Sequence, residues 1–265
     1  MKIGILSKRT GKFSGKIKKY LESNGHQVSI FTAANLSINK SLLVNDFYIL
    51  KSKHLLYIYA GYYLKSNKVS VIPNTNISYI HKNRIESYFA IKKTGLLVPK
   101  VYMGSINTFK NQLRSSHFPL ISKPIFGSGS NGVKIHNSIK DLNSNSEEPL
   151  YLESYIDGNH YLAYFIENEF CICEKKPFTN EHSKMKLIKS DEEIEEYLRK
   201  WKMQYNLLFG HLDLVREKAT NELYVVDAGT FPEFSNWKHK TDPTAKICNL
   251  ILQKYKEIRK LNNIC

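Results

Sequence analysis

The feature that most constrains the fold is an alternation of short apolar runs with helical segments, which begins at the first residues. Residues 16–23 place Ile17 and Leu21 about one helical turn apart, and Gly25 follows where such a helix would end. Apolar runs of strand length lie before and after this helix, at residues 2–6, 28–31, 46–50 and 69–73. Strands that alternate with helices form parallel sheets. The sequence therefore predicts an N-terminal parallel α/β domain over residues 1–80.

The pattern changes beyond this domain. Asn83 is a favourable helix cap, Glu86 stands three residues later, and Gly95 is placed to end the helix. Short strands joined by loops are predicted next. From residue 151 on, the sequence predicts longer strands within 151–173 and helices at 191–205 and 243–261. Residues 212–215 and 223–226 are predicted to form a hairpin. We therefore expect two further α+β units, over residues 81–150 and 151–265.

The charge of the chain restricts its partners. Thirty-nine lysines and arginines against 24 acidic residues give a net charge of +15. Such a charge attracts polyanions and phosphorylated ligands. Only six of the 39 cations are arginine, whereas specific recognition of phosphates and bases favours arginine. We therefore expect small phosphorylated ligands as partners rather than nucleic acid.

No segment of the sequence predicts a membrane span or a signal peptide. The longest apolar tract, residues 55–64, is about half the length of a spanning helix. The N-terminal run reaches Lys8 and Arg9 before an apolar signal core could form. Cys171 and Cys173 face one side of a predicted strand, and no nearby histidine completes a zinc site. We expect a cytoplasmic protein with reduced thiols.

A lysine followed by a loop rich in glycine and serine is the first candidate for binding chemistry. Lys123 ends an apolar run, and the loop Gly127-Ser-Gly-Ser-Asn-Gly132 precedes a second strand that begins at Val133. Glycines let main-chain N–H groups approach phosphate oxygens, and a fixed ammonium group would bind the same phosphates. An ordinary glycine hairpin with an exposed lysine is the alternative interpretation.

Two aspartates on neighbouring predicted strands are the second candidate. Asp213 lies in Gly-His-Leu-Asp-Leu-Val, and Asp227 lies in Tyr-Val-Val-Asp-Ala-Gly. Both stand among apolar residues, where an unpaired carboxylate is costly. Paired carboxylates beside nucleotide phosphates suit Mg²⁺, although a salt bridge would also stabilise them. A third segment, residues 151–158, is an apolar strand that ends in a turn and could present main-chain groups to an adenine edge.

Taken in order, these segments resemble the ATP-grasp superfamily over residues 79–252. The matching sequences are NRIESYFAIKKTGLLVP, FPLISKPIFGSGSNGV, YLESYIDG, GHLDLV and VVDAGTFPEF. Within the superfamily, the KP…GSxxxGV loop is most similar to that of the RimK-like carboxylate–amine ligases. The resemblance implies an ATP-grasp fold, in which an N-terminal parallel α/β domain precedes two α+β subdomains that enclose ATP.

The resemblance also implies a role for each matched residue. Lys123 and Arg84 would stabilise the transferred phosphate, the glycine-rich loop would cover it, and residues 153–156 would contact adenine. Asp213 and Asp227 would bind Mg²⁺, and Arg216 is a further catalytic candidate. The residues implied to bind ATP are Arg84, Lys123, Gly127, Ser128, Gly129, Ser130, Gly132, Val133, Glu153, Ser154, Tyr155, Ile156 and His160. Anionic groups of the substrate could contact Lys175, Lys176 and Arg216.

Three positions depart from the family pattern. Asp227 stands where the last metal ligand is commonly glutamate, Gly229 where an asparagine ligand is usual, and Arg84 where a lysine is usual. Glu233 or Asn236 could replace the missing ligand. The departures leave three functions open. We favour an ATP- and Mg²⁺-dependent ligase that joins a carboxylate to an amine through an acyl phosphate.

The alternatives are a small-molecule kinase and a nucleotide-binding protein without catalysis. The segment Asp-x-x-x-Phe-Pro-x-Phe that begins at Asp227 also resembles that of the inositol polyphosphate kinases, in which the acceptor is an alcohol. The missing asparagine favours a protein that only binds nucleotide. For the ligase, the expected partners are ATP and a small-molecule or peptide carboxylate with an amine, and the protein could form a homo-oligomer.

Overall fold

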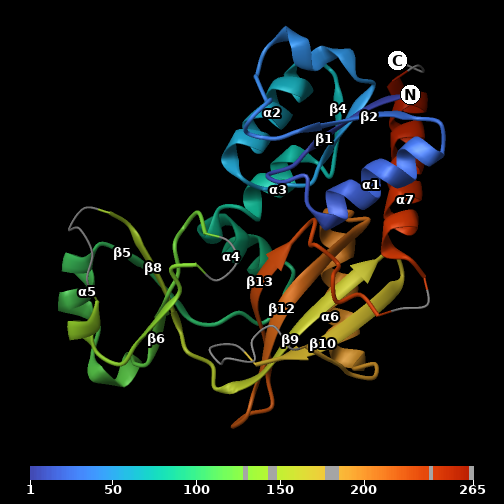
Figure 1. Cartoon of the computed structure of the whole chain (residues 1–265). Helices are drawn as coiled ribbons and strands as arrows, with labels where there is room; N and C mark the ends of the chain where they lie inside the picture. The colour runs from blue at the N-terminus through green and yellow to red at the C-terminus, as the bar shows by residue number, and fades with distance from the viewer. Residues whose placement is uncertain (128–130, 143–147, 177–184, 239–240, 263–265) are drawn as a thin grey trace.

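Three separate sheets organise the structure, a computed structural model that describes residues 1–127, 131–142, 148–176, 185–238 and 241–262. A four-stranded parallel sheet lies at the top of Figure 1, a small antiparallel sheet at its left, and a five-stranded antiparallel sheet below. The parallel sheet comes from the first part of the chain, as the alternating pattern predicts. The mixed α/β class is therefore confirmed.

The parallel sheet has the strand order β2-β1-β3-β4. Its strands are β1 (Lys2–Leu6), β2 (Gln27–Phe31), β3 (Phe47–Leu50) and β4 (Ser70–Ile72). Helices α1 (Lys12–Ser23) and α2 (Leu55–Ser66) connect them. The apolar tract at residues 55–64 thus becomes helix α2, in which Tyr57, Ile58 and Leu64 are buried. Because all four strands are parallel, their carboxyl ends lie at one edge, where ligands bind in sheets of this kind.

Helices α3 (Thr75–Ile80) and α4 (Arg84–Lys93) lead from this sheet into the rest of the chain. The predicted cap at Asn83 is confirmed, because its side chain accepts the main-chain N–H groups of Ile85 and Glu86 at 3.1 and 3.4 Å. This cap fixes the first turn of α4 and therefore the position of Arg84, the first residue of the helix.

The small antiparallel sheet has the order β5-β8-β6-β7 and is covered by helix α5 (Ile106–Gln112). Its strands are β5 (Val101–Gly104), β6 (Leu120–Ser122), β7 (Lys134–His136) and β8 (Leu150–Ser154). Ile106, Phe109, Leu120 and Leu152 form its core. The glycine-rich segment falls between β6 and β7 in the sequence, and the structure describes Gly127, Asn131 and Gly132 of it.

The large sheet has the order β11-β10-β9-β12-β13. Its strands are β9 (Gly158–Ile166), β10 (Glu169–Lys175), β11 (Lys186–Leu187), β12 (Phe209–Glu217) and β13 (Leu223–Gly229), and helix α6 (Glu192–Tyr205) packs on one face. The predicted hairpin is confirmed, because β12 and β13 pair in antiparallel fashion. The opposite face of the large sheet carries the candidate site and contacts the N-terminal sheet.

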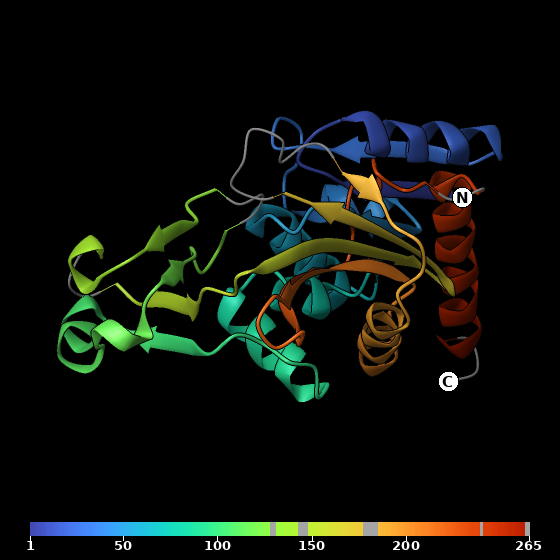
Figure 2. The ribbon, with the colours of Figure 1, turned by 90° about the horizontal axis from the view of Figure 1, so that it is seen from below.

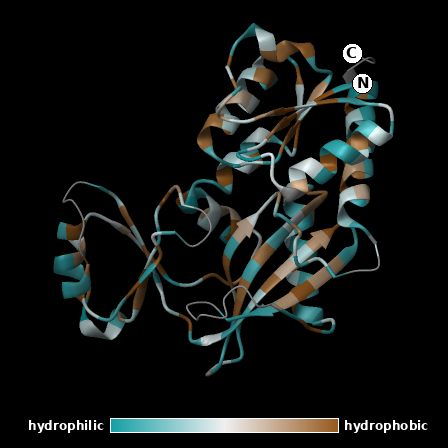
Figure 3. Ribbon diagram, in the orientation of Figure 1, coloured by the Kyte–Doolittle hydropathy of each residue, from teal (hydrophilic) through white to brown (hydrophobic). Residues whose placement is uncertain are grey.

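Helix α7 (Pro243–Asn262) joins the parallel sheet to the large sheet. It lies beside α1 in both views of the ribbon (Figures 1 and 2). Ile247 and Ile251 of α7 share one buried cluster with Ile3 of β1 and Phe209 of β12. Figure 3 shows the corresponding apolar colour along the inner strands. Among the described residues, no helix is both long and apolar enough to cross a membrane.

Candidate functional site

A pocket between the small sheet and the large sheet collects most of the residues that the motifs predict. Strand ends of the small sheet supply one wall, and the face of β9, β10, β12 and β13 that is turned away from α6 supplies the other. The pocket is lined by Arg84, Ile121, Lys123, Val133, Glu153, Ser154, Ile156, His160, Lys175, Asp213, Val215, Val226 and Asp227. Residues far apart in the sequence therefore converge here.

Lys123 is held by both walls of the pocket. It follows β6, and its main-chain N–H donates to the carbonyl of Tyr151 at 3.2 Å. Its Nζ donates to the carbonyl of Val226 at 3.1 Å and forms an ion pair with Glu153. The hydroxyl of Tyr151 also donates to Glu153, at 3.2 Å. Since Glu153 is only 2% exposed, its charge needs this ammonium group as a partner.

Arg84 connects the start of α4 to the entrance of the glycine-rich loop. Its main-chain N–H donates to the carbonyl of Ile125 at 2.9 Å, and its Nε donates to the carbonyl of Pro124 at 3.3 Å. Its Nη1 lies 3.7 Å from a carboxylate oxygen of Asp227. One guanidinium group therefore contacts both Pro124, shortly before the glycine-rich loop, and an acidic residue.

Asp213 and Asp227 lie directly opposite each other on β12 and β13. The pairing shifts after Asp213, so that Leu214 faces Val225 and Val226 is the extra residue of a bulge. Val225 and Ala228 face the core beside α6, whereas Val226 and Asp227 both line the pocket. Strict alternation from Val225 would turn Asp227 into that core. The bulge therefore directs this carboxylate into the pocket, a known use of bulges beside functional sites.

The two carboxylates lie in a cationic environment. Burial raises the pKa of Asp227, but the charges of Arg84, Lys53 and Lys123 outweigh burial and hold the pKa below its usual range. Asp213 accepts a hydrogen bond from Nζ of Lys175 at 2.8 Å. Each carboxylate is thus paired with a cation that lines the same pocket.

The end of β8 and the start of β9 form a further part of the pocket. Glu153, Ser154, Ile156 and His160 line it. Burial, followed by the charge of Lys175, lowers the pKa of His160 to about 4. At neutral pH this histidine is therefore uncharged, which suits a hydrogen bond to a neutral part of a ligand such as a ribose hydroxyl.

The carboxylate pair passes a structural test for a magnesium site. Mg²⁺ binds through one or two carboxylates, with phosphate oxygens and water completing its shell. Asp213 and Asp227 supply two oxygen donors beside the Lys123 ammonium group. Within the described ranges, no group of three or more His, Cys, Asp or Glu residues is arranged for a metal ion. The donor set therefore fits a metal shared with a bound phosphate.

The structure explains why glycine stands at position 229, where the family pattern has asparagine. It lies opposite His211 on β12, and a Cβ at this position would lie 2.2 Å from Cε1 of that histidine. His211 thus occupies the space of a side chain at position 229. The proposed substitutes for the missing ligand are engaged elsewhere, because Glu233 pairs with Lys51 at 2.7 Å and the Asn236 amide contacts Met185 at 3.1 Å.

Replacing Gly229 with alanine should lower the free energy of unfolding by about 1–3 kcal/mol, because the new Cβ overlaps the ring of His211. Urea unfolding would measure this change. Gly104→Ala is the matched control, since Gly104 also lies in a strand but its Cβ would meet only ordinary contacts of 3.4 Å or more. Adding His211→Ala to Gly229→Ala should restore part of the loss. Equal stability of the two single variants would contradict the role of His211.

The structure does not bring every predicted residue into the pocket. Arg216 forms ion pairs with Asp191 and Glu193 at 3.0 and 2.5 Å, at the start of α6 on the opposite face of the large sheet. Asp213 and Val215 face the pocket, so the next residue faces away. Gly127, Gly132 and Tyr155 are not among the lining residues. Ser128, Gly129 and Ser130, which the resemblance also implies to bind ATP, lie outside the described residues.

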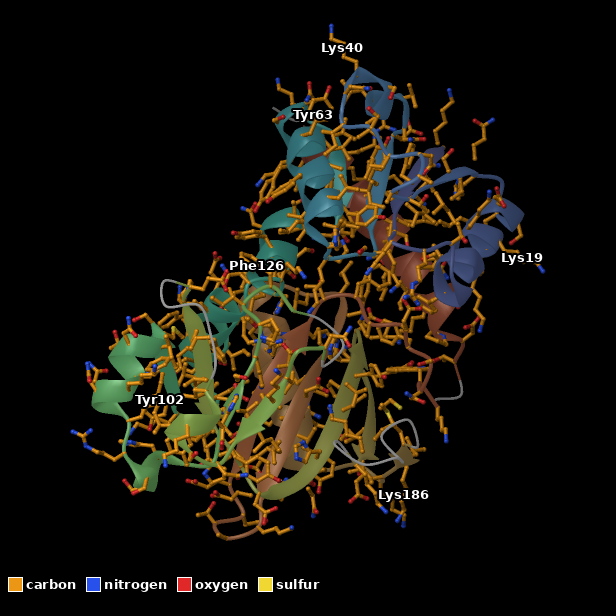
Figure 4. All side chains as sticks on the ribbon, turned by 60° about the vertical axis from the view of Figure 1, so that its left-hand side comes forward. Lys19, Lys40, Tyr63, Tyr102, Phe126 and Lys186 are labelled. Atoms are coloured by element: carbon orange, nitrogen blue, oxygen red, sulfur yellow. The ribbon has the colours of Figure 1, made fainter. Side chains whose placement is uncertain are left out.

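Several charged residues near the pocket were not predicted from the motifs. Lys51 and Lys53 directly follow β3, at the carboxyl end of the parallel sheet. Lys82 precedes α4, and its Nζ donates to the carbonyl of Phe126 at 3.0 Å. Phe126 itself lies where the N-terminal unit meets the small sheet (Figure 4). The signal that could have revealed the first two is their position after a parallel strand.

Comparisons with known proteins give structural matches only. No protein-family model and no curated protein matches the chain. The D-alanine–D-alanine ligase of Bacillus anthracis complexed with ATP matches with a TM-score of 0.72 and 16% identity over 99% of both chains. The D-cycloserine synthetase DcsG matches with a TM-score of 0.74 and 11% identity, over 96% of this chain and 100% of the other.

A third match is the ATP-grasp ligase PsnB, whose structure was determined with a minimal precursor, Mg and ADP. Its TM-score is 0.67, with 13% identity over 96% of this chain and 98% of the other. Because each of the three similarities covers almost the whole chain, they show that this protein has the predicted ATP-grasp fold.

Proposed function

We propose that this protein is an ATP- and Mg²⁺-dependent ligase that joins a carboxylate to an amine. In the first half-reaction, the carboxylate of one substrate would attack the γ-phosphate of ATP and form an acyl phosphate and ADP. In the second half-reaction, an amine would attack the acyl carbon and release phosphate. Neither step requires a covalent bond to the protein, so the chain has to supply position and charge.

The convergence of Lys123, Arg84, Asp213 and Asp227 on one pocket carries this proposal. Lys123 directly follows β6, and the other three come from α4, β12 and β13. Lys123 and Arg84 both contact the bulge that holds Asp227. This arrangement of opposite charges suits the binding of a phosphate chain together with a metal ion. A structural core would not need two carboxylates and two cations at such a point.

The residues of the pocket would act by binding and orientation. Lys123 and Arg84 would donate hydrogen bonds to phosphate oxygens and stabilise the charge that develops during transfer. Asp213 and Asp227 would hold Mg²⁺, which supplies charge neutralisation between the phosphates when it is bound. The segment of Glu153 to Ile156 would place the adenine, and neutral His160 would contact the ribose.

The solved relatives support the reaction type and leave the substrates open. The B. anthracis enzyme is a D-alanine–D-alanine ligase, DcsG is a D-cycloserine synthetase, and PsnB was determined with a precursor, Mg and ADP. For this chain we propose ATP, Mg²⁺, an acid and an amine. A closer relation to the RimK-like ligases remains a prediction from the KP…GSxxxGV loop.

Product analysis tests the proposal against the two alternatives. The purified protein would be incubated with ATP, Mg²⁺ and pools of acids, amines and sugar alcohols, and ADP, phosphate and new masses would be measured. A ligase should release ADP and phosphate and form an amide only when an acid and an amine are both present. A phosphorylated alcohol would indicate a kinase. Binding of ATP without any Mg²⁺-dependent turnover would indicate a protein that only binds nucleotide.

A further inference from the structure

A second pocket lies next to the carboxylate pair, on the side of the N-terminal sheet. It is lined by Leu50, Lys51, Lys53, Ser78, His211, Gly229, Thr230 and Phe231. These residues come from the carboxyl end of β3, from α3, and from the ends of β12 and β13. The first pocket shares none of these residues. The two pockets therefore meet along β12 and β13 but have separate walls.

The position of this second pocket relative to the phosphate site follows from the strand register. His211 faces Gly229 two residues beyond the pair of Asp213 and Asp227. Two residues of an antiparallel strand span about 7 Å. His211 and Asp213 are therefore separated by about this distance along β12, so the two pockets are close enough for one small substrate to extend from the first into the second.

The second pocket contains cationic and polar groups without complementary partners. Nζ of Lys53 donates to the carbonyl of His81 at 3.1 Å, and Lys53 has no ion pair with a described carboxylate. Nδ1 of His211 is buried and has no hydrogen-bond partner within the described part of the chain. A buried polar atom without a partner is costly. Both groups therefore favour a ligand that carries negative charge and accepts hydrogen bonds.

The balance of ion pairs around the two pockets also favours an anion. Four cations are matched one to one with carboxylates, in the pairs Lys51–Glu233, Arg84–Asp227, Lys123–Glu153 and Lys175–Asp213. Lys53 and Lys82 remain, and each donates only to a main-chain carbonyl within the described chain. Lys82 does so beside the glycine-rich loop, on the phosphate side. Lys53 is thus the additional positive charge of the second pocket.

We propose that the second pocket binds a second anionic group of the acid substrate. The acceptor of the phosphate is then a short dianion, in which the reacting carboxylate and a second carboxylate or phosphate are joined by a short carbon chain, as in glutarate. Lys53 binds the second group, and His211 donates to it through a ring N–H. Lys51, which pairs with Glu233, stands at the wall of the same pocket. This inference rests on the proposed ligase function and specifies its substrate class.

The small side chain at position 229 is consistent with this assignment. An asparagine there would compete with His211 for the same space, since even a Cβ would lie 2.2 Å from the ring. Glycine thus lets the imidazole stand at the wall of the second pocket, beside Lys53. Glycine at position 229 thus removes the asparagine metal ligand of the family pattern and allows His211 to contact the substrate.

A binding series with the ADP- and Mg²⁺-loaded protein tests the inference. Calorimetry would compare butyrate with malonate, succinate, glutarate and phosphoserine. At least one dianion should bind about tenfold or more tightly than butyrate, since a charged hydrogen bond contributes about 1.5–3 kcal/mol. If every dianion binds no better than butyrate, the inference is overturned. This comparison needs no variant and therefore does not depend on whether a variant folds.

A matched pair of variants tests whether Lys53 causes the tighter binding of the dianion. Lys53→Gln should reduce the affinity for the best dianion about tenfold, because its Nζ is the additional cation of the pocket. Lys40→Gln is the control, since Lys40 is exposed and extends into solvent at the far end of the N-terminal unit (Figure 4). An equal loss in both variants, or no loss in Lys53→Gln, would refute the assignment. Unchanged ADP affinity in both variants shows that the nucleotide site is intact, and amide formation in the product analysis described above tests the ligase function separately.

Discussion

Replacing Lys123 with methionine is expected to weaken the binding of ADP or a non-hydrolysable ATP analogue by roughly 10- to 100-fold, because a charged hydrogen bond to a phosphate contributes about 1.5–3 kcal/mol. Lys123 is the cation that both walls of the pocket hold in place, through Glu153 and the carbonyl of Val226. Calorimetry with each nucleotide measures the change. Unchanged affinity would remove Lys123 from the phosphate site.

The same substitution should also affect stability, and the two effects have to be separated. Without Lys123, the buried carboxylate of Glu153 loses its ion-pair partner. Removing one member of a buried pair typically costs about 3–5 kcal/mol. The double variant Lys123→Met/Glu153→Gln removes the unpaired charge and should recover much of this loss. Nucleotide affinity should stay low in the double variant, because the ammonium group is still absent.

Replacing Asp227 with asparagine should reduce Mg²⁺-dependent ATP turnover by about 1,000-fold or more. The substitution keeps the shape of the side chain but removes a negative oxygen ligand, and metal stabilisation of phosphoryl transfer contributes several kcal/mol. The cations Arg84, Lys53 and Lys123 hold this carboxylate in its charged form. Steady-state release of ADP measures the loss once an acceptor is known, and basal ATP hydrolysis measures it before then.

A metal-binding measurement distinguishes loss of the ligand from general damage. Titration of Mn²⁺ into the ADP-bound protein, followed by electron paramagnetic resonance, should show weaker metal binding in Asp227→Asn. Asp46→Asn is the control, because Asp46 is exposed and accepts the main-chain N–H of Lys2 in the N-terminal sheet, remote from the pocket residues. Full activity and normal metal affinity in Asp227→Asn would place the metal elsewhere.

Local patterns explain why much of the site could be predicted from the sequence. Lys123 and the two aspartates interrupt apolar runs, and a charged residue in such a run is conspicuous because it has to find a partner. Asn83 at the start of α4 was recognisable as a cap, and it does place Arg84. Strand alternation could also have excluded Arg216 from the pocket, since it is adjacent to Val215.

Long-range contacts explain what the sequence could not show. The pairing of Lys123 with Glu153 joins two strands of the small sheet, and no periodicity within either strand encodes it. The bulge at Val226 depends on how β13 pairs with β12, and without it Asp227 would face the core. The glycine at position 229 could be read as a lost ligand from the sequence, whereas the structure shows His211 in its place.

By itself, the sequence determined the order of the elements, the parallel N-terminal sheet and the residue types available for phosphate and metal binding, because strands, helices and caps depend on neighbouring residues. Only the tertiary structure decided which of the many lysines face a site. Lys51 and Lys53 come from one segment and His211 from another, and they meet because the carboxyl end of β3 packs against the ends of β12 and β13. Contacts between such distant segments depend on packing of the whole chain, which no local pattern specifies.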